Sequence, residues 1–235
     1  MSDSPFRNVT IVGATGTLGY RIADAFLNDG SYNVKILRKK PENVNAKASS
    51  LAEKSFYEVQ LPLLTAAKDA GVKRFIPSEF GSEYQGISHP FSDDKAKFRA
   101  EVEKRFDIKK KKATFFTDPN LTISTTSLHD VGKYTVESLK IPDARNARIR
   151  VAGATLSFNE LLKKFEEASG SKWEVVEDRE IRKRFREKID PVPSSIEELK
   201  AHICENARFA KTDNDKFSFT PISITDAIKA LVKDA

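Results

Sequence analysis

The feature that most constrains the fold is a glycine-rich turn between a short strand and a helix near the start of the chain. Residues 8–12, Asn-Val-Thr-Ile-Val, are rich in β-branched side chains, which is typical of a buried strand. Residues 13–19, Gly-Ala-Thr-Gly-Thr-Leu-Gly, follow directly, and residues 20–28 have the apolar spacing of a helix that ends at Gly30. A second β-branched run at 33–37 completes a strand–helix–strand unit, which predicts a parallel sheet.

The spacing of the three glycines is what a phosphate-binding turn requires. Gly13 permits a tight turn out of the strand, Gly16 leaves room for a pyrophosphate near the backbone, and Gly19 lets the helix pack closely. Amide groups at the helix start then face the phosphates and stabilise their charge. The alternative is a glycine-rich turn that binds no ligand. We predict a dinucleotide site made by Gly13, Thr15, Gly16, Thr17, Leu18 and Gly19.

The residues that end the second strand indicate which dinucleotide is bound. An NAD site usually has a carboxylate there for the ribose hydroxyls, whereas an NADP site has a basic residue for the 2′-phosphate. This chain has Arg38, Lys39 and Lys40, with no acid before Glu42. Because a guanidinium matches a phosphate in shape and charge, NADP(H) is predicted over NAD(H). Plain surface charge is the alternative explanation for the three basic residues.

Length and composition narrow the class of protein. The chain has 235 residues, of which 31% are charged and 39% hydrophobic, as in an ordinary folded protein. We expect no secretory signal, because residues 1–6 have no basic flank followed by an apolar stretch. The sequence contains no apolar run of the roughly 18–20 residues that a membrane helix needs. One cysteine, Cys204, excludes an internal disulfide framework, and three scattered histidines show no metal-ligand spacing. We therefore expect a soluble, cytoplasmic protein with no metal and no membrane partner.

The net charge of +6 includes two basic clusters, at residues 109–112 and 179–188. A nucleic-acid binder gathers its basic residues on one face, whereas the second cluster here is diluted by acidic residues. We interpret the clusters as a solvated loop and a solvated helix face, and expect no nucleic-acid partner.

Several blocks of sequence together resemble a known family. They are residues 13–19, the run Ala-Ala-Lys-Asp-Ala-Gly-Val-Lys-Arg-Phe-Ile-Pro-Ser-Glu-Phe-Gly at 66–81, and shorter runs at 95–103, 130–136 and 155–162. With them the chain resembles the NmrA-like and isoflavone-reductase-like family of atypical short-chain dehydrogenase/reductases. The ordinary members of that superfamily need a tyrosine four residues before a lysine, and none of the five tyrosines here has one. The atypical branch is therefore the one that matches.

The resemblance implies roles for particular residues. It makes Lys95 the catalytic acid/base, and it makes Arg38, with Lys39 beside it, the contact for the 2′-phosphate. Lys47 matches a second phosphate-contacting lysine, and Phe80 is similar to a phenylalanine that lies near the nicotinamide. Without the resemblance, we would interpret Lys95 as one more surface lysine on a charged helix.

The predicted fold class is α/β: a Rossmann-type doubly wound parallel sheet with missing strands, and a smaller α+β C-terminal lobe. We expect an NAD(P)-binding domain at 1–140 and a substrate lobe at 141–235, interwoven with the first. Phe158 and Trp173 are expected in the core. Further helices are predicted at 59–70, 93–105, 158–168, 179–188, 196–206 and 225–232, and further strands at 72–77, 148–152 and 173–176.

Two segments depart from the family pattern. Residues 38–58 are polar and contain no β-branched run for a third or fourth strand, and residues 106–113 lack an expected apolar strand. Either the strand at 72–77 pairs with 9–12, or the sheet is frayed, because unpaired buried backbone groups are costly. Three hypotheses stay open. The chain is an NADPH-dependent reductase of a small substrate, with an aromatic one as a candidate. Alternatively, it is a catalytically impaired regulator that senses dinucleotide and binds a protein partner, or the product of a faulty gene model.

Overall fold

The computed structural model describes residues 4–37, 56–78, 80 and 106–233. Their contacts divide the chain into two units whose segments alternate along the sequence. The first unit comprises Met1–Val44, Ser124–Thr155 and Ala210–Ala227, and the second comprises the remaining segments. Each unit is described by itself, and the division at residues 140 and 141 stays a prediction.

The first unit begins with the predicted strand–helix–strand. Strand β1 (Asn8–Val12) pairs in parallel with β2 (Asn33–Leu37), with Asn8 opposite Asn33 and Val12 opposite Leu37. Helix α1 (Thr17–Asp29) connects them and ends at Gly30, whose φ of 72° is the left-handed value that favours glycine. Its buried face carries Ile22, Ala23 and Phe26, and the ring of Phe26 meets that of Tyr32 edge-on at 5.1 Å.

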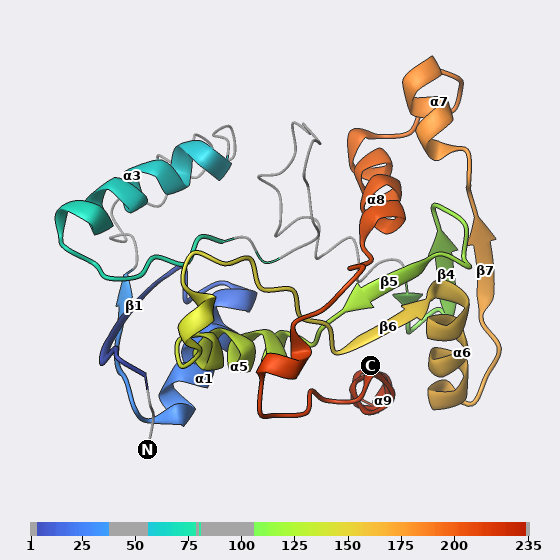
Figure 1. Ribbon diagram of the computed structural model, residues 1–235. Helices are drawn as coiled ribbons and strands as arrows, with labels where there is room; N and C mark the ends of the chain where they lie inside the picture. The colour runs from blue at the N-terminus through green and yellow to red at the C-terminus, as the bar shows by residue number, and fades with distance from the viewer. Residues whose placement is uncertain (1–3, 38–55, 79, 81–105, 234–235) are drawn as a thin grey trace. The chain divides into compact units, whose positions relative to one another are not determined.

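Helix α5 (Leu128–Ser138) packs along α1, as Figure 1 shows, and the sequence did not predict it. A glycine at the crossing makes the close approach possible, because a Cβ on Gly132 would lie 2.5 Å from the carbonyl oxygen of Arg21. The N-cap of α5 is Ser127, whose hydroxyl accepts from the amide of Asp130. The fully buried Asp130 carboxylate accepts in turn from Ser127 and from the amide of Ile222, which ties a distant loop to this helix.

The strand predicted at 148–152 is wrong, since the strand in this region is β6 (Ala154–Ser157), which pairs with β5 (Thr122–Thr125). The backbone of residues 148–152 forms hydrogen bonds with the side chains of Asp213 and Asn214, and not with a neighbouring strand. The amide of Ala152 donates to the side chain of Asn214, and the Asn214 amide donates back to the carbonyl of Ala152. The amide of Arg150 donates to the Asp213 carboxylate at 2.9 Å.

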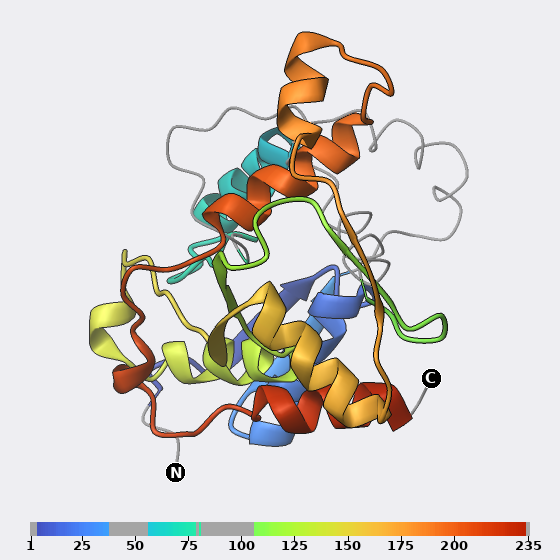
Figure 2. The same ribbon diagram turned by 90° about the vertical axis from the view of Figure 1, so that its right-hand side faces the viewer.

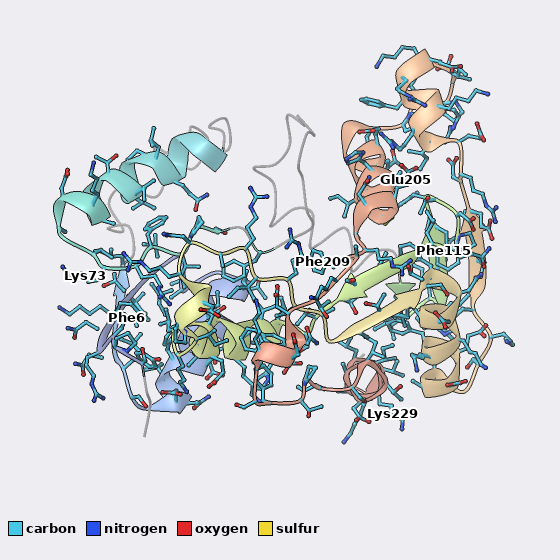
Figure 3. The ribbon with its side chains drawn as sticks, in the orientation of Figure 1. Phe6, Lys73, Phe115, Glu205, Phe209 and Lys229 are labelled. Carbon is cyan, nitrogen blue, oxygen red and sulfur yellow. The ribbon has the colours of Figure 1, made fainter. Side chains whose placement is uncertain are left out.

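The second unit contains a three-stranded sheet in the order β3–β4–β7, of which β3 and β4 were not predicted. Strand β4 (Lys112–Phe115) is antiparallel to β3 (Phe106–Asp107) and parallel to β7 (Glu174–Glu177), which lies one residue later than predicted. Phe115, labelled in Figure 3, is buried and its ring lies 5.8 Å from that of Phe158.

Helix α6 (Phe158–Ser169) begins where the sequence predicts and ends one residue later. Ser157 and Glu160 form a reciprocal capping box at its start, and Gly170 closes it with a φ of 63°. Both Phe158 and Trp173 are buried, as predicted, and Trp173 packs on Phe165 with ring centres 5.2 Å apart.

The basic segment at 179–188 forms α7 (Ile181–Glu187), and α8 (Ser195–Asn206) follows it. Arg182 pairs with Glu198 and with Glu205, the latter labelled in Figure 3. Other ion pairs join Arg184 to Asp178, Arg179 to Glu177 and Lys183 to Glu180. These arginines are paired with nearby carboxylates, which fits a charged helix face. Helix α9 (Ile224–Lys233) is the last element and is visible in Figure 2 near the C-terminus.

Helix α3 (Phe56–Asp69) begins three residues before the predicted start, and the strand predicted at 72–77 is wrong. Residues 72–77 form no regular element, with Val72 and Ile76 exposed to 53% and 42%. A β-branched run becomes a strand only when a neighbour pairs its backbone, and within the described residues none does so here. The helix predicted at 93–105 lies outside the described residues.

Candidate functional site

The glycine turn between β1 and α1 is the candidate site, and its backbone has the conformation that its glycines permit. Gly13 has a φ of 80°, a value that residues with a side chain rarely adopt. The amide of Gly16 donates to the Gly13 carbonyl at 3.0 Å, which closes the turn, and the amide of Tyr20 donates to the Gly16 carbonyl at 2.8 Å, which starts the helix. The turn and the first helical turn are therefore one continuous hydrogen-bonded structure.

The space around the other two glycines of the turn explains one of them, Gly19, and leaves the other, Gly16, unexplained. A Cβ on Gly19 would lie 2.1 Å from the carbonyl oxygen of Gly13 and 3.0 Å from the Cα of Ala14, so only glycine allows this contact between helix and turn. A Cβ on Gly16 would lie 3.4 Å from the same carbonyl oxygen, which the protein itself tolerates. The need for glycine at 16 therefore does not come from the surrounding protein, whereas the need at 19 does.

The start of α1 leaves its backbone amides available. Its N-cap is Gly16, which has no side chain to accept from them, and its first turn contains no acidic residue. By contrast, α5, α6 and α8 each begin with a serine that accepts such a hydrogen bond. Thr15, Gly16 and Thr17 are exposed, while Ala14 is buried beneath them. Uncapped amides and the positive end of the helix dipole favour an anion, so the turn fits the phosphates of a dinucleotide.

The opposite end of α1 is fixed by an ion-pair cluster. The ammonium of Lys140 donates to Asp29 at 2.9 Å and to Glu137 at 2.7 Å, which joins the last turns of α1 and α5. Burial alone would lower the pKa of Lys140, but its hydrogen bonds to Glu137 and Asp29 outweigh burial and raise it. Burial alone would raise the pKa of Asp29, but the hydrogen bonds that it accepts from Lys140 and Ser31 outweigh burial and lower it.

The structure brings together six of the predicted site residues and leaves the others untested. Gly13, Thr15, Gly16, Thr17, Leu18 and Gly19 form the turn. Phe80 is half-buried and belongs to the second unit. Arg38, Lys39, Lys47 and Lys95 lie outside the described residues.

One supporting residue was missed by the sequence reasoning. Gly132 allows the close approach of α5 to α1. The run at 130–136 contains this glycine, but in the sequence it indicated only the family resemblance and no helix.

Among the described residues, no group of three histidine, cysteine, aspartate or glutamate side chains is arranged to hold a metal ion. The same part of the chain contains no helix that is both long and apolar enough to span a membrane.

Comparisons with known proteins identify relatives of the chain, although no family model matches it. It is 26% identical over 191 residues to pinoresinol reductase 1 of Arabidopsis thaliana, covering 67% of this chain and 60% of that protein. It is 22% identical to phenylcoumaran benzylic ether reductase PT1 of Pinus taeda, covering 92% of this chain and 91% of that protein. This second alignment extends over 288 positions. Since the chain has 235 residues, at least 53 of these positions are occupied by the relative alone, which supports internal shortening.

Solved structures show the fold. The structure of isoflavone reductase matches 96% of this chain with a TM-score of 0.67 and 17% identity, and covers 99% of that chain. AtPrR2 with NADP+ and (+)pinoresinol matches 96% of this chain and 98% of its own, with a TM-score of 0.68 and 20% identity. The fold and the glycine turn thus define a Rossmann-type α/β protein. Within that class, the comparisons agree with the predicted resemblance, since the chain is similar in sequence to proteins named pinoresinol reductase and phenylcoumaran benzylic ether reductase.

Proposed function

We propose that the chain binds NADP(H) and serves as an NADPH-dependent reductase of a small aromatic substrate. The observation that carries the proposal is the turn at 13–19, where uncapped amides face solvent and the glycine at 16 is required by nothing in the protein itself. The relatives support the chemistry, because two of them are named as reductases of pinoresinol and of a phenylcoumaran benzylic ether. A structural neighbour binds NADP+.

The chain's own residues would have the following roles. The amides of residue 15 and of residues 17–19 hold the pyrophosphate, because the Gly16 amide already donates to the Gly13 carbonyl. Arg38, with Lys39 and Lys47, holds the 2′-phosphate, because several positive charges suit a dianionic group. Phe80 lies against the nicotinamide, and Lys95 donates a proton from its Nζ to the substrate. When bound, the cofactor supplies the hydride. The roles outside the turn rest on the sequence resemblance.

A catalytically impaired regulator is the second candidate. The relatives named above are reductases, so they do not favour it over the enzyme. The cytoplasmic location and the split into domains at 1–140 and 141–235 stay predictions from the sequence.

Titration with NADPH and NADH, followed by nicotinamide fluorescence, tests the proposal. We expect NADPH to bind more tightly, and Gly16→Ala to weaken its binding by roughly tenfold, because a methyl group would occupy the pyrophosphate's approach. Gly153→Ala is the matched control, since a Cβ there meets only ordinary contacts at 3.4 Å or more. Unchanged NADPH binding by Gly16→Ala would contradict a pyrophosphate site at the turn. Equal affinity for NADPH and NADH would contradict the role of Arg38.

Turnover is a separate test. We expect NADPH oxidation in the presence of aryl ethers, enones or aldehydes, and we expect Lys95→Ala to abolish it while leaving NADPH binding intact. Undiminished turnover by this variant would remove Lys95 from the mechanism.

A further inference from the structure

A cavity of about 450 Å³, largely open to solvent, lies in the second unit, and none of the residues assigned above is among those that line it. This volume is in the range of sites that hold small molecules. Its lining combines an apolar wall with two cationic side chains, and the residues are Ile108, Lys109, Lys111, Ala168, Ser169 and Val232. They come from the turn between β3 and β4, the C-terminal end of α6, and α9.

The backbone at Lys111 is in a conformation that favours glycine. Its φ is 50°, and its amide donates to the Ile108 carbonyl at 3.3 Å, so it closes a tight turn. A residue with a side chain is strained there, and strain of this kind is often found at functional positions. The surroundings hold it in place, because its carbonyl accepts from the amide of Glu174 at 2.9 Å.

The ammonium of Lys111 is also fixed. It donates to the hydroxyl of Ser171 at 2.6 Å, and that hydroxyl donates to the carbonyl of Ser169 at 3.1 Å. The charge is therefore held at the end of α6 beside the cavity.

The charges of the two cavity lysines are not neutralised within the described part of the chain. No carboxylate there pairs with Lys109 or Lys111, whereas Lys112 pairs with Glu174 at 2.8 Å and Lys172 pairs with Glu166 at 2.8 Å. Two ammonium groups next to an apolar wall are chemically suited to an anionic head group on an apolar body.

We propose that this cavity binds a small organic monocarboxylate. The carboxylate lies between the ammonium groups of Lys109 and Lys111, and the hydrocarbon lies against Ile108, Ala168 and Val232. Site and ligand are independent of the dinucleotide turn, so failure of either proposal leaves the other intact.

Calorimetric titration of the full chain with octanoate tests the proposal. We expect binding at one site per chain, weakened roughly tenfold by the double variant Lys109→Ala/Lys111→Ala, because two charge-assisted contacts are lost. The double variant Lys163→Ala/Lys183→Ala is the matched control, since it removes the same charge from lysines on α6 and α7 that pair with Glu167 and Glu180. Octylamine has a similar body and the opposite charge, and we expect it not to bind.

Three results would overturn the proposal. They are no octanoate binding, equal binding by the wild type and the Lys109→Ala/Lys111→Ala variant, and acetate binding as tightly as octanoate. The last result would mean a general attraction for anions with no role for the apolar wall.

Lys111→Gly separates ligand binding from a structural role. Glycine suits the φ of 50°, so we expect the melting temperature to be maintained or raised while octanoate affinity falls. If octanoate affinity is unchanged and the melting temperature falls, Lys111 serves only to tether the end of α6, and the proposal is wrong.

Discussion

Replacing Gly19 by alanine is the most direct test of how the turn and α1 fit together. The new Cβ would lie 2.1 Å from the Gly13 oxygen, 2.7 Å from the Gly13 carbonyl carbon and 3.0 Å from the Ala14 Cα. All three atoms belong to the backbone, so no side chain can rotate away. Relief requires α1 to move by about 1 Å relative to β1, in a densely packed region.

Two opposing effects set the size of the change in stability. Alanine in place of glycine inside a helix gains about 1 kcal/mol from backbone entropy. Inserting a methyl group into a packed contact costs about 1–3 kcal/mol, and the short distance to backbone atoms places this contact at the upper end. We therefore expect a net loss of about 2 kcal/mol in the free energy of unfolding.

Urea denaturation followed by the fluorescence of Trp173 measures this loss. With a denaturant slope of about 2 kcal/mol/M, the midpoint should fall by about 1 M. Gly153→Ala is the control, and we expect its midpoint to be unchanged or slightly higher, because its Cβ would meet only contacts of 3.4 Å or more. A Gly19→Ala midpoint equal to that of the wild type would refute the packing argument.

Three further predictions concern α1, α5 and α6. Gly132→Ala places a Cβ 2.5 Å from the Arg21 oxygen, so we expect a smaller loss, about 1 kcal/mol, by the same urea assay; a gain would contradict the α1–α5 contact. Lys140→Met should cost about 1 kcal/mol at pH 7, because Asp29 and Glu137 lose a partly buried partner. The Asp29–Lys140 contribution should be present above pH 3.8 and disappear as the pH falls through the lowered pKa of Asp29; at high pH it should be full below 10.5 and be lost as the pH rises from there through the raised pKa of Lys140. Equal pH profiles for variant and wild type would exclude it. Ser157→Ala removes the capping box of α6 and should cost about 1 kcal/mol in thermal unfolding, whereas Ser157→Asn, which keeps a capping oxygen, should cost less; equal costs would argue against the cap.

The elements that the sequence predicted are those whose signals are local. Gly13, Gly16 and Gly19 lie within seven residues and fix the turn, and Ser157 with Gly170 marks both ends of α6. These signals act over a few residues and need no distant partner to be recognised.

The elements that were missed depend on partners far along the chain. Helix α5 carries polar residues and a glycine, and it is held by α1, about a hundred residues earlier. Strand β4 follows a run of lysines and pairs with β7, with Lys112 opposite Glu174. The predicted strands at 72–77 and 148–152 have the right residues, but no described strand pairs with them, so composition alone predicted strands where none forms.

The phosphate-binding and proton-transferring parts of the proposed site are affected differently by the shortening of the chain. The glycine turn needs only β1, α1 and β2, and all three are formed, with α5 packed on α1. Backbone amides at a helix start stabilise a pyrophosphate without the rest of the sheet. Lys95 instead follows residues 72–77, which form no strand. If NADPH binds but no substrate is turned over, the loss of catalytic activity would therefore be due to the part of the chain that follows β2. Turnover that Lys95→Ala abolishes would show that residues 72–105 still bring this lysine to the cofactor.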